Sequence, residues 1–386
     1  MTPLFVFCAD LHLEDGAWST RPGIYGDSYY SFQQIVEYCI AHKLPLVMGG
    51  DILEKKQNLA RPIAKLCEGL TKLQDAGVSA YYIQGNHEFD RNAPWLSVHT
   101  WPAHLHQQAA LIGGKKVYGL DWLPRGEIQA AFEQVPADTD ILITHQVWED
   151  FMQNVGRTDC NLNDVHHVRT VLAGDFHVTK VAESVNAQGA AIRMLSPGST
   201  CMQDMGESAE KFFFVIAADG ADFVFTPVPL VTRRVANYVV KDTETLDKLC
   251  AGQLTADIAA LRGGLPAELD KPLVRVKFDK RLPDAYLRIA TTVGESAHLF
   301  CEAIVERGGA KAEAQKTDRT RNDLLSALAD LLGEDEEAYK LAVSLLNAAD
   351  PAKEFDVQFS KYTRELEDAT LETGSSELGT PSPAHM

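Results

Sequence analysis

Residues 81–88 read YYIQGNHE, and this stretch decides how the rest of the sequence is interpreted. The apolar run at residues 81–83 is short and continuous, which is typical of a buried strand. The polar side chains of Asn86, His87 and Glu88 follow just past its carboxyl end, where open α/β sheets form their ligand crevice. Amide, imidazole and carboxylate groups all bind metal ions, so the stretch predicts one strand and one wall of a metal site.

The same arrangement recurs four more times in the first part of the sequence. Short apolar runs occupy residues 5–8, 46–48, 141–143 and 171–173, and polar side chains follow each of them. Those side chains are Asp10, His12, Asp51, His145, Asp175 and His177. If all five runs are strands of α/β sheets, the five loops converge on one crevice.

The donor types indicate a centre for two metal ions. Mixed carboxylate, imidazole and amide ligands suit Mn, Fe or Zn, and the lack of paired cysteines argues against a structural zinc site. Two ions roughly 3.5–4 Å apart hold the attacking and departing oxygens of an in-line phosphoryl displacement. Asp51 stands alone on its loop and is the best candidate to bridge them. A single Asp-x-His or Gly-Asp is weak evidence, but five blocks in order disfavour a purely structural interpretation.

The five blocks resemble the pattern of the calcineurin-like metallophosphoesterases, which is D-x-H, G-D, G-N-H-[DE], a lone H and then G-H-x-H. The resemblance implies that His87 acts on the phosphoryl oxygens or the leaving alkoxide, that Glu88 orients its ring, and that the nucleophile is metal-bound water. It assigns the first metal ion to Asp10, His12, Asp51 and His177. It assigns the second metal ion to Asp51, Asn86, His145 and Asp175.

One block departs from this family pattern. Residues 174–177 read GDFH, so Asp175 stands where the family usually has histidine. A carboxylate still binds a metal ion, but it adds negative charge and lowers the Lewis acidity of that ion. We therefore expect a preference shifted toward Mn²⁺, with Mg²⁺ as the second choice.

Residues 194–200 read MLSPGST and Glu207 follows, which resembles the strand and Gly-Ser turn of the SbcD-type nucleases of double-strand-break repair. Phage recombination endonuclease subunits share that arrangement. The resemblance implies a manganese-dependent nuclease for DNA repair, recombination or replication, acting as an exonuclease on double strands and an endonuclease on single strands. It also implies a homodimer, for which helices near residues 28–41 and 61–76 are the candidates. Glu54 stands where this family usually has histidine.

The expected fold class is α/β: a two-sheet metallophosphoesterase sandwich flanked by helices, a small α/β capping domain and a C-terminal helical pair. Residues 1–230 would form the nuclease domain, and residues 231–315 a cap with strands at 272–278 and 286–289. Leucines at helical spacing predict two amphipathic helices in residues 316–368, which would bind an SbcC-type coiled-coil ATPase, as the resemblance implies, or pack on each other or on the cap. Residues 369–386 have the composition of a disordered tail.

The charge distribution limits how DNA is held. The whole chain carries a net charge of −18, with −11 in residues 1–230, +2 in residues 231–320 and −9 in residues 321–386. A protein that grips DNA through a broad basic surface is not expected to have this balance. Contact with DNA must then be local and helped by the metal ions, the cap or a second subunit.

Two other functions fit the same metal blocks. One is a small-molecule phosphodiesterase or phosphatase, for instance on cyclic nucleotides, which would act without a partner. The other is a regulatory subunit whose centre is weakened by Asp175 and which binds the ATPase but leaves DNA intact.

The cellular compartment follows from cysteine usage and apolar runs. The seven cysteines are scattered without any C-x-x-C pair, which is typical of a reducing cytoplasm. No apolar run approaches the length of a membrane span, and the run at residues 4–8 is too short for a signal peptide. We expect a cytoplasmic protein, in a bacterium or a phage-infected cell, that neither enters a membrane nor is exported.

Overall fold

The computed structural model divides the chain into one compact unit of residues 1–304 and a second of residues 305–386. The predicted helical pair at 316–368, the predicted tail at 369–386 and the end of the predicted cap lie outside the described residues. All described elements therefore belong to the first unit. The described residues are 2–15, 24–55, 60–89, 99–152, 158–220, 222–262, 266, 269, 271–282 and 284–304.

The first of two central sheets carries three of the predicted ligand loops. β1, β2, β3 and β4 pair in parallel, and β11 and β12 add an antiparallel hairpin beside β1. Within the described ranges the strand order is β12-β11-β1-β2-β3-β4. The strands are β1 (Thr2–Cys8), β2 (Leu46–Gly49), β3 (Ala80–Ile83), β4 (Ala103–His104), β11 (Lys211–Asp219) and β12 (Asp222–Leu230). Because β1, β2 and β3 are parallel, their carboxyl ends lie at one edge of the sheet.

The second sheet carries the other two loops. β6, β7, β8 and β10 pair in parallel, while β5 and β9 are antiparallel to their neighbours. Its order, for the part of the chain that is described, is β5-β6-β7-β8-β10-β9. The strands are β5 (Gln108–Ile112), β6 (Lys115–Leu120), β7 (Ile141–His145), β8 (Thr170–Gly174), β9 (Lys180–Val185) and β10 (Ala191–Ser196).

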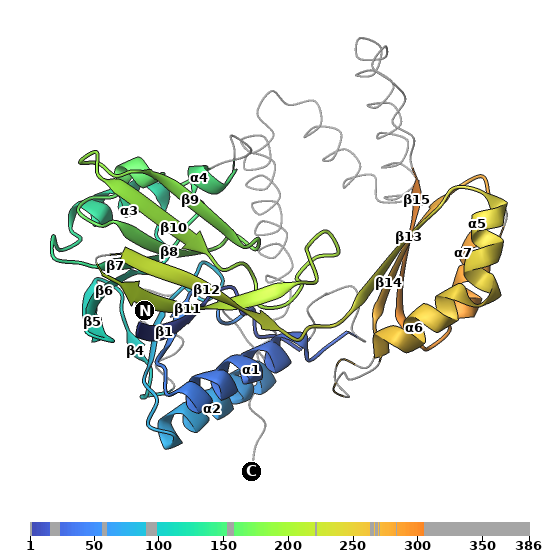
Figure 1. The fold of residues 1–386 in the computed structure, drawn as a ribbon, viewed down its shortest axis with the longest axis horizontal. Helices are drawn as coiled ribbons and strands as arrows, with labels where there is room; N and C mark the ends of the chain where they lie inside the picture. Colours follow the sequence, from blue (N-terminus) through green and yellow to red (C-terminus); the bar gives the residue numbers. More distant parts are fainter. Residues whose placement is uncertain are drawn as a thin grey trace, which may run out of the picture. The chain divides into compact units, whose positions relative to one another are not determined.

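Apolar side chains fill the space between the two sheets. Phe5 and Phe7 of β1 are buried in one cluster with Ile143 of β7 and Leu172 of β8. Alternate residues of the same strands point outward, as Val6 does, and are buried under helices. Strands buried on both faces explain why the sequence shows continuous apolar runs and not alternation. The predicted two-sheet sandwich is confirmed (Figure 1).

Helices cover the outer faces of the sandwich. Phe32 of α1 and Leu70 of α2 are buried in the same cluster as Met48 of β2, and Phe132 of α3 is buried with Leu142 of β7. The helices of this part are α1 (Asp27–His42), α2 (Ala60–Asp75), α3 (Arg125–Glu133), the short α4 (Glu149–Met152) and a 3-10 turn at Leu162–Asp164. Among the described residues, no helix combines the length and the apolar character needed to cross a membrane.

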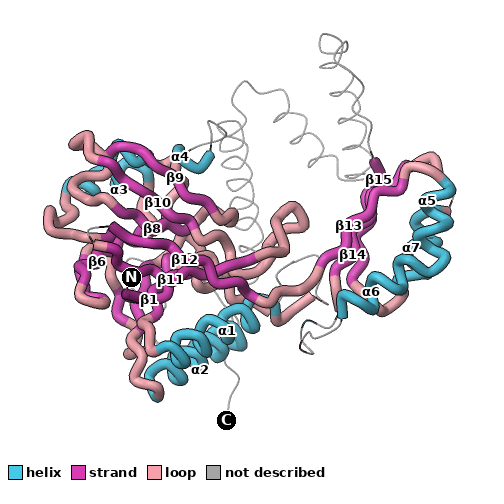
Figure 2. Tube along the Cα trace, in the orientation of Figure 1, coloured by secondary structure: helices cyan, strands magenta, loops and turns pink. Residues whose placement is uncertain are grey.

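A smaller α/β part follows the sandwich, with β13, β14 and β15 in parallel pairs and helices against one face (Figure 2). Val274 and Val276 of β14 are buried against those helices, as the alternating pattern at residues 272–278 predicts. The elements are β13 (Val235–Val240), α5 (Thr243–Lys248), a π-helical stretch at Leu249–Gln253, α6 (Leu254–Arg262), β14 (Leu273–Asp279), α7 (Ala285–Val293) and β15 (His298–Ile304).

The strand predicted at residues 286–289 is wrong, because these residues lie in helix α7. Ala285, Ile289 and Val293 are its buried residues and recur every four positions, which is the helical period. Tyr286 and Leu287 are exposed on the helix surface. An apolar run of four residues does not distinguish a strand from a helix segment, and here the longer pattern decides.

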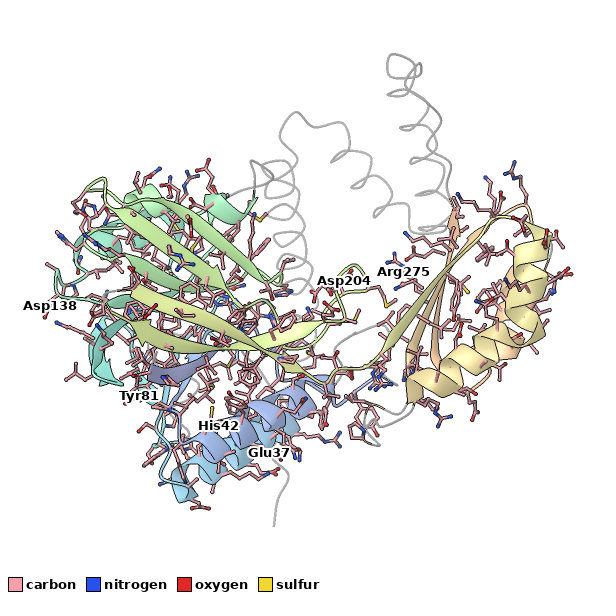
Figure 3. The ribbon with its side chains drawn as sticks, in the orientation of Figure 1. Glu37, His42, Tyr81, Asp138, Asp204 and Arg275 are labelled. Carbon is pink, nitrogen blue, oxygen red and sulfur yellow. The ribbon has the colours of Figure 1, made fainter. Side chains whose placement is uncertain are left out.

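Two arginines join the smaller part to the sandwich. The guanidinium of Arg233 is buried and donates to the carboxylate of Asp27 and to the backbone oxygens of Tyr25 and Lys271. Arg275 of β14 donates from Nη1 to the backbone oxygen of Met205 at 3.1 Å, beside Asp204 in Figure 3. Arg233 therefore links the start of α1 to Lys271 just before β14, and Arg275 links β14 to the loop that precedes β11.

Candidate metal centre

Every predicted ligand follows or ends a strand of the sandwich. Asp10 and His12 follow β1, Asp51 follows β2 and Asn86 follows β3. From the second sheet, His145 is the last residue of β7, and Asp175 and His177 follow β8. The packing of the two sheets therefore brings loops from distant parts of the sequence together.

The ligand loops turn sharply at the strand ends. Asp10, His12, Asp51 and Asp175 have φ angles of 52°, 44°, 47° and 83°, in the left-handed region that side chains other than glycine seldom adopt. Such a conformation costs about 1–3 kcal/mol at each residue and persists only where the surroundings hold it. Strain of this kind is concentrated at functional sites, which supports a functional reading of these loops.

The first group of donors is Asp10, His12 and His177. Nε2 of His12 lies 3.1 Å from Nε2 of His177, and the two atoms are 4.0 and 3.8 Å from Oδ1 of Asp10. These donor atoms all lie within 4.8 Å of one another, which is close enough to share one metal ion. The structure thus brings together three of the four ligands predicted for the first ion.

The two imidazoles of this group are arranged to receive a positive charge. Nδ1 of His12 lies 2.7 Å from a carboxylate oxygen of Glu54, and Nδ1 of His177 lies 3.0 Å from one of Glu207. A proton on each Nδ1 suits these carboxylates, and a neutral ring then has a lone pair on Nε2. Two lone pairs facing each other repel, so either a proton or a metal ion must lie between the Nε2 atoms. The group therefore fits a divalent cation.

The second group contains Asp51 and His145, and Asn86 follows β3 at the same edge of the sheet as Asp51. Nδ1 of His145 donates to the backbone oxygen of Gly49 at 2.8 Å, which leaves Nε2 facing Oδ2 of Asp51 at 3.3 Å. Nε2 of His145 and Oδ1 of Asn86 are both buried and have no hydrogen-bond partner. A buried polar atom without a partner is costly, and coordination of a metal ion would satisfy both atoms.

Asp51 lies between the two groups. Its Oδ2 is 3.3 Å from Nε2 of His145 and 3.7 Å from Nε2 of His12, which belongs to the first group. Its Oδ1 accepts a hydrogen bond from the backbone N–H of His87 at 3.0 Å, so the carboxylate is held in place. The carboxylate of Asp51 therefore lies within 4 Å of an imidazole of each group.

Asp175 lies at the edge of the second group. Its Oδ1 is 3.8 Å from Nε2 of His145, and its backbone N–H donates to the carboxylate of Asp10 at 3.0 Å. The backbone contact ties the loop after β8 to the loop after β1, and it does not depend on the side chain at this position. The side-chain carboxylate of Asp175 takes no part in that backbone contact, so it is available to a metal ion.

Burial and like charge alter the pKa values of the acids in the centre. Burial raises the pKa of Asp10, raises that of Asp175 to about 6, and together with the Asp51 charge raises that of Glu88 to about 8. The pKa of Asp51 is lowered, because the imidazoles of His145 and His12 outweigh the effect of its burial. The centre holds more carboxylates than can all be ionised without added positive charge, and a divalent cation would supply that charge.

Glu88 does not have the predicted role. Its Oε1 accepts from the backbone N–H groups of Gly85 at 3.0 Å and Ile52 at 3.2 Å, and the residue is fully buried. The ring of His87 is held instead by the backbone oxygen of Glu54, which accepts from Nδ1 at 2.6 Å. The prediction fails because neighbouring residues of a turn point in different directions, and Glu88 faces the backbone of two ligand loops.

Glu207, Ser199 and Lys211 support the centre behind His177. The first two belong to the stretch that resembles the SbcD-type nucleases, whereas no motif indicated Lys211. Oε2 of Glu207 accepts from Nζ of Lys211 at 2.6 Å and from the hydroxyl of Ser199 at 3.0 Å, while Oε1 faces His177. Lys211 also donates to Ser199 and is buried. The signal for Lys211 in the sequence is its spacing of four residues from Glu207, which alone is common.

The first part of the chain matches a known family. Residues 3–179 match the family model of the calcineurin-like phosphoesterases. The matched range begins in β1 and ends just past His177, so it contains all the predicted ligands. The predicted metallophosphoesterase domain is therefore confirmed.

Three archaeal relatives share part of the sequence, and each is named a DNA double-strand break repair protein Mre11. The protein of Haloferax volcanii is 30% identical over 145 residues, which cover 36% of this chain and 33% of the relative. That of Methanosarcina acetivorans is 21% identical over 222 residues, covering 54% and 35%, and that of Halobacterium salinarum is 28% identical over 145 residues, covering 36% and 38%. The matched segments thus span about a third of the length of these relatives.

Proposed function

This chain carries a calcineurin-like metallophosphoesterase domain, and on that premise we propose that it is a two-metal DNA nuclease. The substrate would be DNA, cut as an exonuclease on double strands and as an endonuclease on single strands. The relatives named for double-strand break repair support DNA over a small molecule as the substrate. Repair, recombination or replication of DNA would be the setting.

One observation carries the proposal. Asp51 lies within 4 Å of imidazoles of both donor groups, and the buried Nε2 of His145 and Oδ1 of Asn86 have no hydrogen-bond partner. A bridging carboxylate between two sets of ligands is the arrangement that a two-metal phosphoesterase needs. The first ion would be held by Asp10, His12, Asp51 and His177. The second would be held by Asp51, Asn86, His145 and Asp175.

The metal ions, His87 and Glu88 would have different roles in the reaction. When bound, the ions supply Lewis acidity and a strong nucleophile at neutral pH. His87 is the catalytic residue that would contact the phosphoryl oxygens or protonate the leaving oxygen, since 34% of its side chain is exposed and its Nδ1 is held by the backbone. Glu88 would act only as a positioning residue, through the backbone of residues 85 and 52.

We propose Mn²⁺ as the preferred ion, with Mg²⁺ as a weaker substitute. The donor set contains the carboxylates of Asp10, Asp51 and Asp175, and oxygen donors favour Mg²⁺ and Mn²⁺ over softer ions. The imidazoles favour Mn²⁺ over Mg²⁺, which seldom takes nitrogen ligands and prefers to keep its water. Asp175 in place of a histidine strengthens the oxygen character of the second site.

We also propose two protein partners in the cytoplasm of a bacterium or a phage-infected cell. A coiled-coil ATPase of the SbcC type would bind the predicted helices of residues 316–368. A second copy of the chain would dock on α1 and α2, where Tyr25, Tyr30, Arg61 and Lys65 are among the residues that line a hollow of about 350 Å³. Light scattering of the purified protein tests the dimer, because a mass near the 42.5 kDa of one chain would contradict it.

Digestion of end-labelled DNA tests the nuclease. Purified protein is incubated with double-stranded or single-stranded DNA and with Mn²⁺, Mg²⁺ or EDTA, beside His87→Ala and Asp51→Ala variants. We expect loss of DNA that needs Mn²⁺ and that both substitutions abolish. Intact DNA together with rapid turnover of a cyclic nucleotide would replace the nuclease by a small-molecule phosphodiesterase. Intact DNA together with binding of the ATPase would identify a regulatory subunit.

A further inference from the structure

We propose that Glu54 is a positioning residue that holds two imidazoles of the centre, His12 through its side chain and His87 through its backbone oxygen, and that its carboxylate strengthens metal binding at His12. The inference rests on the proposed two-metal centre. It concerns the position at which the sequence departs from its family, and it gives that departure a physical role.

The side chain of Glu54 contacts His12 on the side away from the other donors. Oε2 of Glu54 lies 2.7 Å from Nδ1 of His12, although the geometry is not that of an aligned hydrogen bond. The opposite ring atom, Nε2, faces Asp10, Asp51 and His177 at 4.0, 3.7 and 3.1 Å. Glu54 thus faces one nitrogen of the ring and the metal ligands face the other.

A carboxylate at this place controls which nitrogen of His12 is available. An ionised carboxylate only accepts, so it favours a proton on Nδ1 and a lone pair on Nε2, which is the form that binds a metal ion. The negative charge also makes the ring a stronger donor. A histidine at position 54 has a donor nitrogen and an acceptor nitrogen, so it does not impose one form on His12. The carboxylate of Glu54 imposes the form of His12 that has its proton on Nδ1.

The backbone of Glu54 acts on the second ring. Nδ1 of His87 lies 2.6 Å from the backbone oxygen of Glu54, and because that oxygen only accepts, Nδ1 must carry the proton. Nε2 of His87 is then directed to the centre, 3.9 Å from Oδ2 of Asp51. This contact needs only the backbone of residue 54, so it is independent of the side chain there.

The loop that carries Glu54 is held by its neighbours. His12 and Leu13 donate their backbone N–H groups to the backbone oxygens of Asp51 and Ile52, each at 2.9 Å. These bonds continue the parallel pairing of β1 and β2 beyond the ends of both strands. The loop is therefore ordered by the backbone, and only 27% of the Glu54 side chain is exposed.

Metal binding without any substrate tests the proposal. Mn²⁺ alone is titrated calorimetrically into the full chain and into Glu54→Gln, with Glu37→Gln as a matched control on the exposed face of α1 (labelled in Figure 3). Loss of a carboxylate that faces a metal-binding histidine typically weakens metal binding 10–100-fold, so we expect about that loss at one site of Glu54→Gln and none in Glu37→Gln. Glu54→His should show a loss of the same kind.

Nitrogen NMR of the histidine rings separates the two roles. In the metal-free wild-type chain we expect the His12 and His87 signals of rings with a proton on Nδ1. In Glu54→Gln the His12 signal should change, because an amide both donates and accepts. The His87 signal should change less, because its hydrogen-bond partner is the backbone oxygen at 2.6 Å and Oε1 of Glu54 lies farther away, at 3.7 Å. Equal changes in both rings would overturn the division of roles.

The outcomes distinguish this inference from the proposed function. If the wild-type chain binds no Mn²⁺, the two-metal centre itself is wrong. If the wild-type chain and Glu54→Gln bind two ions with equal affinity, only the role of Glu54 is wrong. Should Glu54→Gln fail to fold, Glu54→Asp keeps the charge but shortens the reach, and unchanged Mn²⁺ affinity in that variant would overturn the inference.

Discussion

Asp51 and His145 belong to different sheets, yet Oδ2 of Asp51 lies 3.3 Å from Nε2 of His145. Asp51 follows β2 of the first sheet, while His145 is the last residue of β7 in the second. The ring of His145 is also tied by Nδ1 to Gly49, the last residue of β2. The centre therefore exists only when the two sheets are packed on each other, and metal binding should be coupled to the folding of the sandwich.

Replacing Asp51 tests that coupling. In Asp51→Asn the bridging carboxylate is lost, but the amide keeps nearly the same shape in a site crowded with acids. Without metal we expect a free energy of unfolding roughly 1–3 kcal/mol below that of the wild-type chain, because the imidazoles of His145 and His12 stabilise the ionised carboxylate of Asp51, as its lowered pKa shows, and the neutral amide loses that interaction. With Mn²⁺ at 100 times its Kd the wild-type chain should gain about 2.7 kcal/mol, and the variant clearly less. Urea unfolding with and without Mn²⁺ measures both effects.

A matched variant for this measurement is Asp138→Asn. Asp138 is exposed and precedes β7, whereas the predicted ligand His145 ends that strand, so the two lie at opposite ends of β7 (Figure 3). It should unfold as the wild-type chain does in both conditions. A gain with Mn²⁺ that is equal in wild type and Asp51→Asn would mean that Asp51 does not bind the ions.

Gly174 sets how closely the loop after β8 approaches His145. A Cβ at this position would overlap Nδ1 of His145 and the backbone oxygen of Gly49. Gly174→Ala should therefore cost about 1–3 kcal/mol of unfolding free energy and should weaken Mn²⁺ binding, because His145 has to move. The matched substitution is Gly126→Ala in α3, where a Cβ meets nothing within 4 Å and should stabilise the helix by up to about 1 kcal/mol. Equal unfolding midpoints for the two variants would contradict this packing.

The positions of the candidate ligands at the strand ends were predictable from sequence because two simple rules reinforce each other there. Each apolar run identifies a strand, and each polar residue after it is placed at the sheet edge by the direction of that strand. Asp10 and His145 follow this rule although they are 135 positions apart and lie in different sheets. The approach of those two sheets is set by the buried layer between them, which no short motif encodes.

The surroundings of the ligands were not predictable in the same way. Glu88 adjoins His87 in the sequence, yet its carboxylate is bound by backbone N–H groups of residues 85 and 52. The sequence shows only that Glu54 stands where the related nucleases usually have histidine. Its contact with His12 arises because its loop packs beside residues 10–13. Contacts of this kind depend on loop conformation in three dimensions, which spacing along the chain does not determine.

Arg233 makes a buried contact between the sandwich and the smaller α/β part, and its removal should lower the free energy of unfolding. It is buried, and its guanidinium donates to Asp27 and to the backbone oxygens of residues 25 and 271. Arg233→Met removes these bonds and leaves Asp27 unpaired, so we expect a loss of about 3–5 kcal/mol in urea unfolding. Arg233→Lys should lose less, since one bond to Asp27 can form again.

A double variant checks that the pair is the cause. Asp27→Asn together with Arg233→Met removes the unpaired charge, so its cost should be smaller than the sum of the two single costs. A cost below about 1 kcal/mol for Arg233→Met would mean that this contact contributes little to the stability of the chain.

Asp175→His should change which metal ion the chain prefers. The substitution replaces an oxygen donor by a nitrogen donor 3.8 Å from His145, and nitrogen donors favour Zn²⁺ over Mn²⁺. Histidine tolerates the left-handed backbone at this position better than most residues, and the backbone N–H can keep its bond to Asp10, so the loop should hold its shape.

Competition between Mn²⁺ and Zn²⁺, followed by calorimetry, should show the ratio of affinities move toward Zn²⁺ by about tenfold or more, which is about 1.4 kcal/mol. Asp219→His at the exposed end of β11 should leave the ratio as it is in the wild-type chain. If the two variants give the same ratio, the side chain of residue 175 does not bind the second ion, and that ion would be held by Asp51, Asn86 and His145 alone.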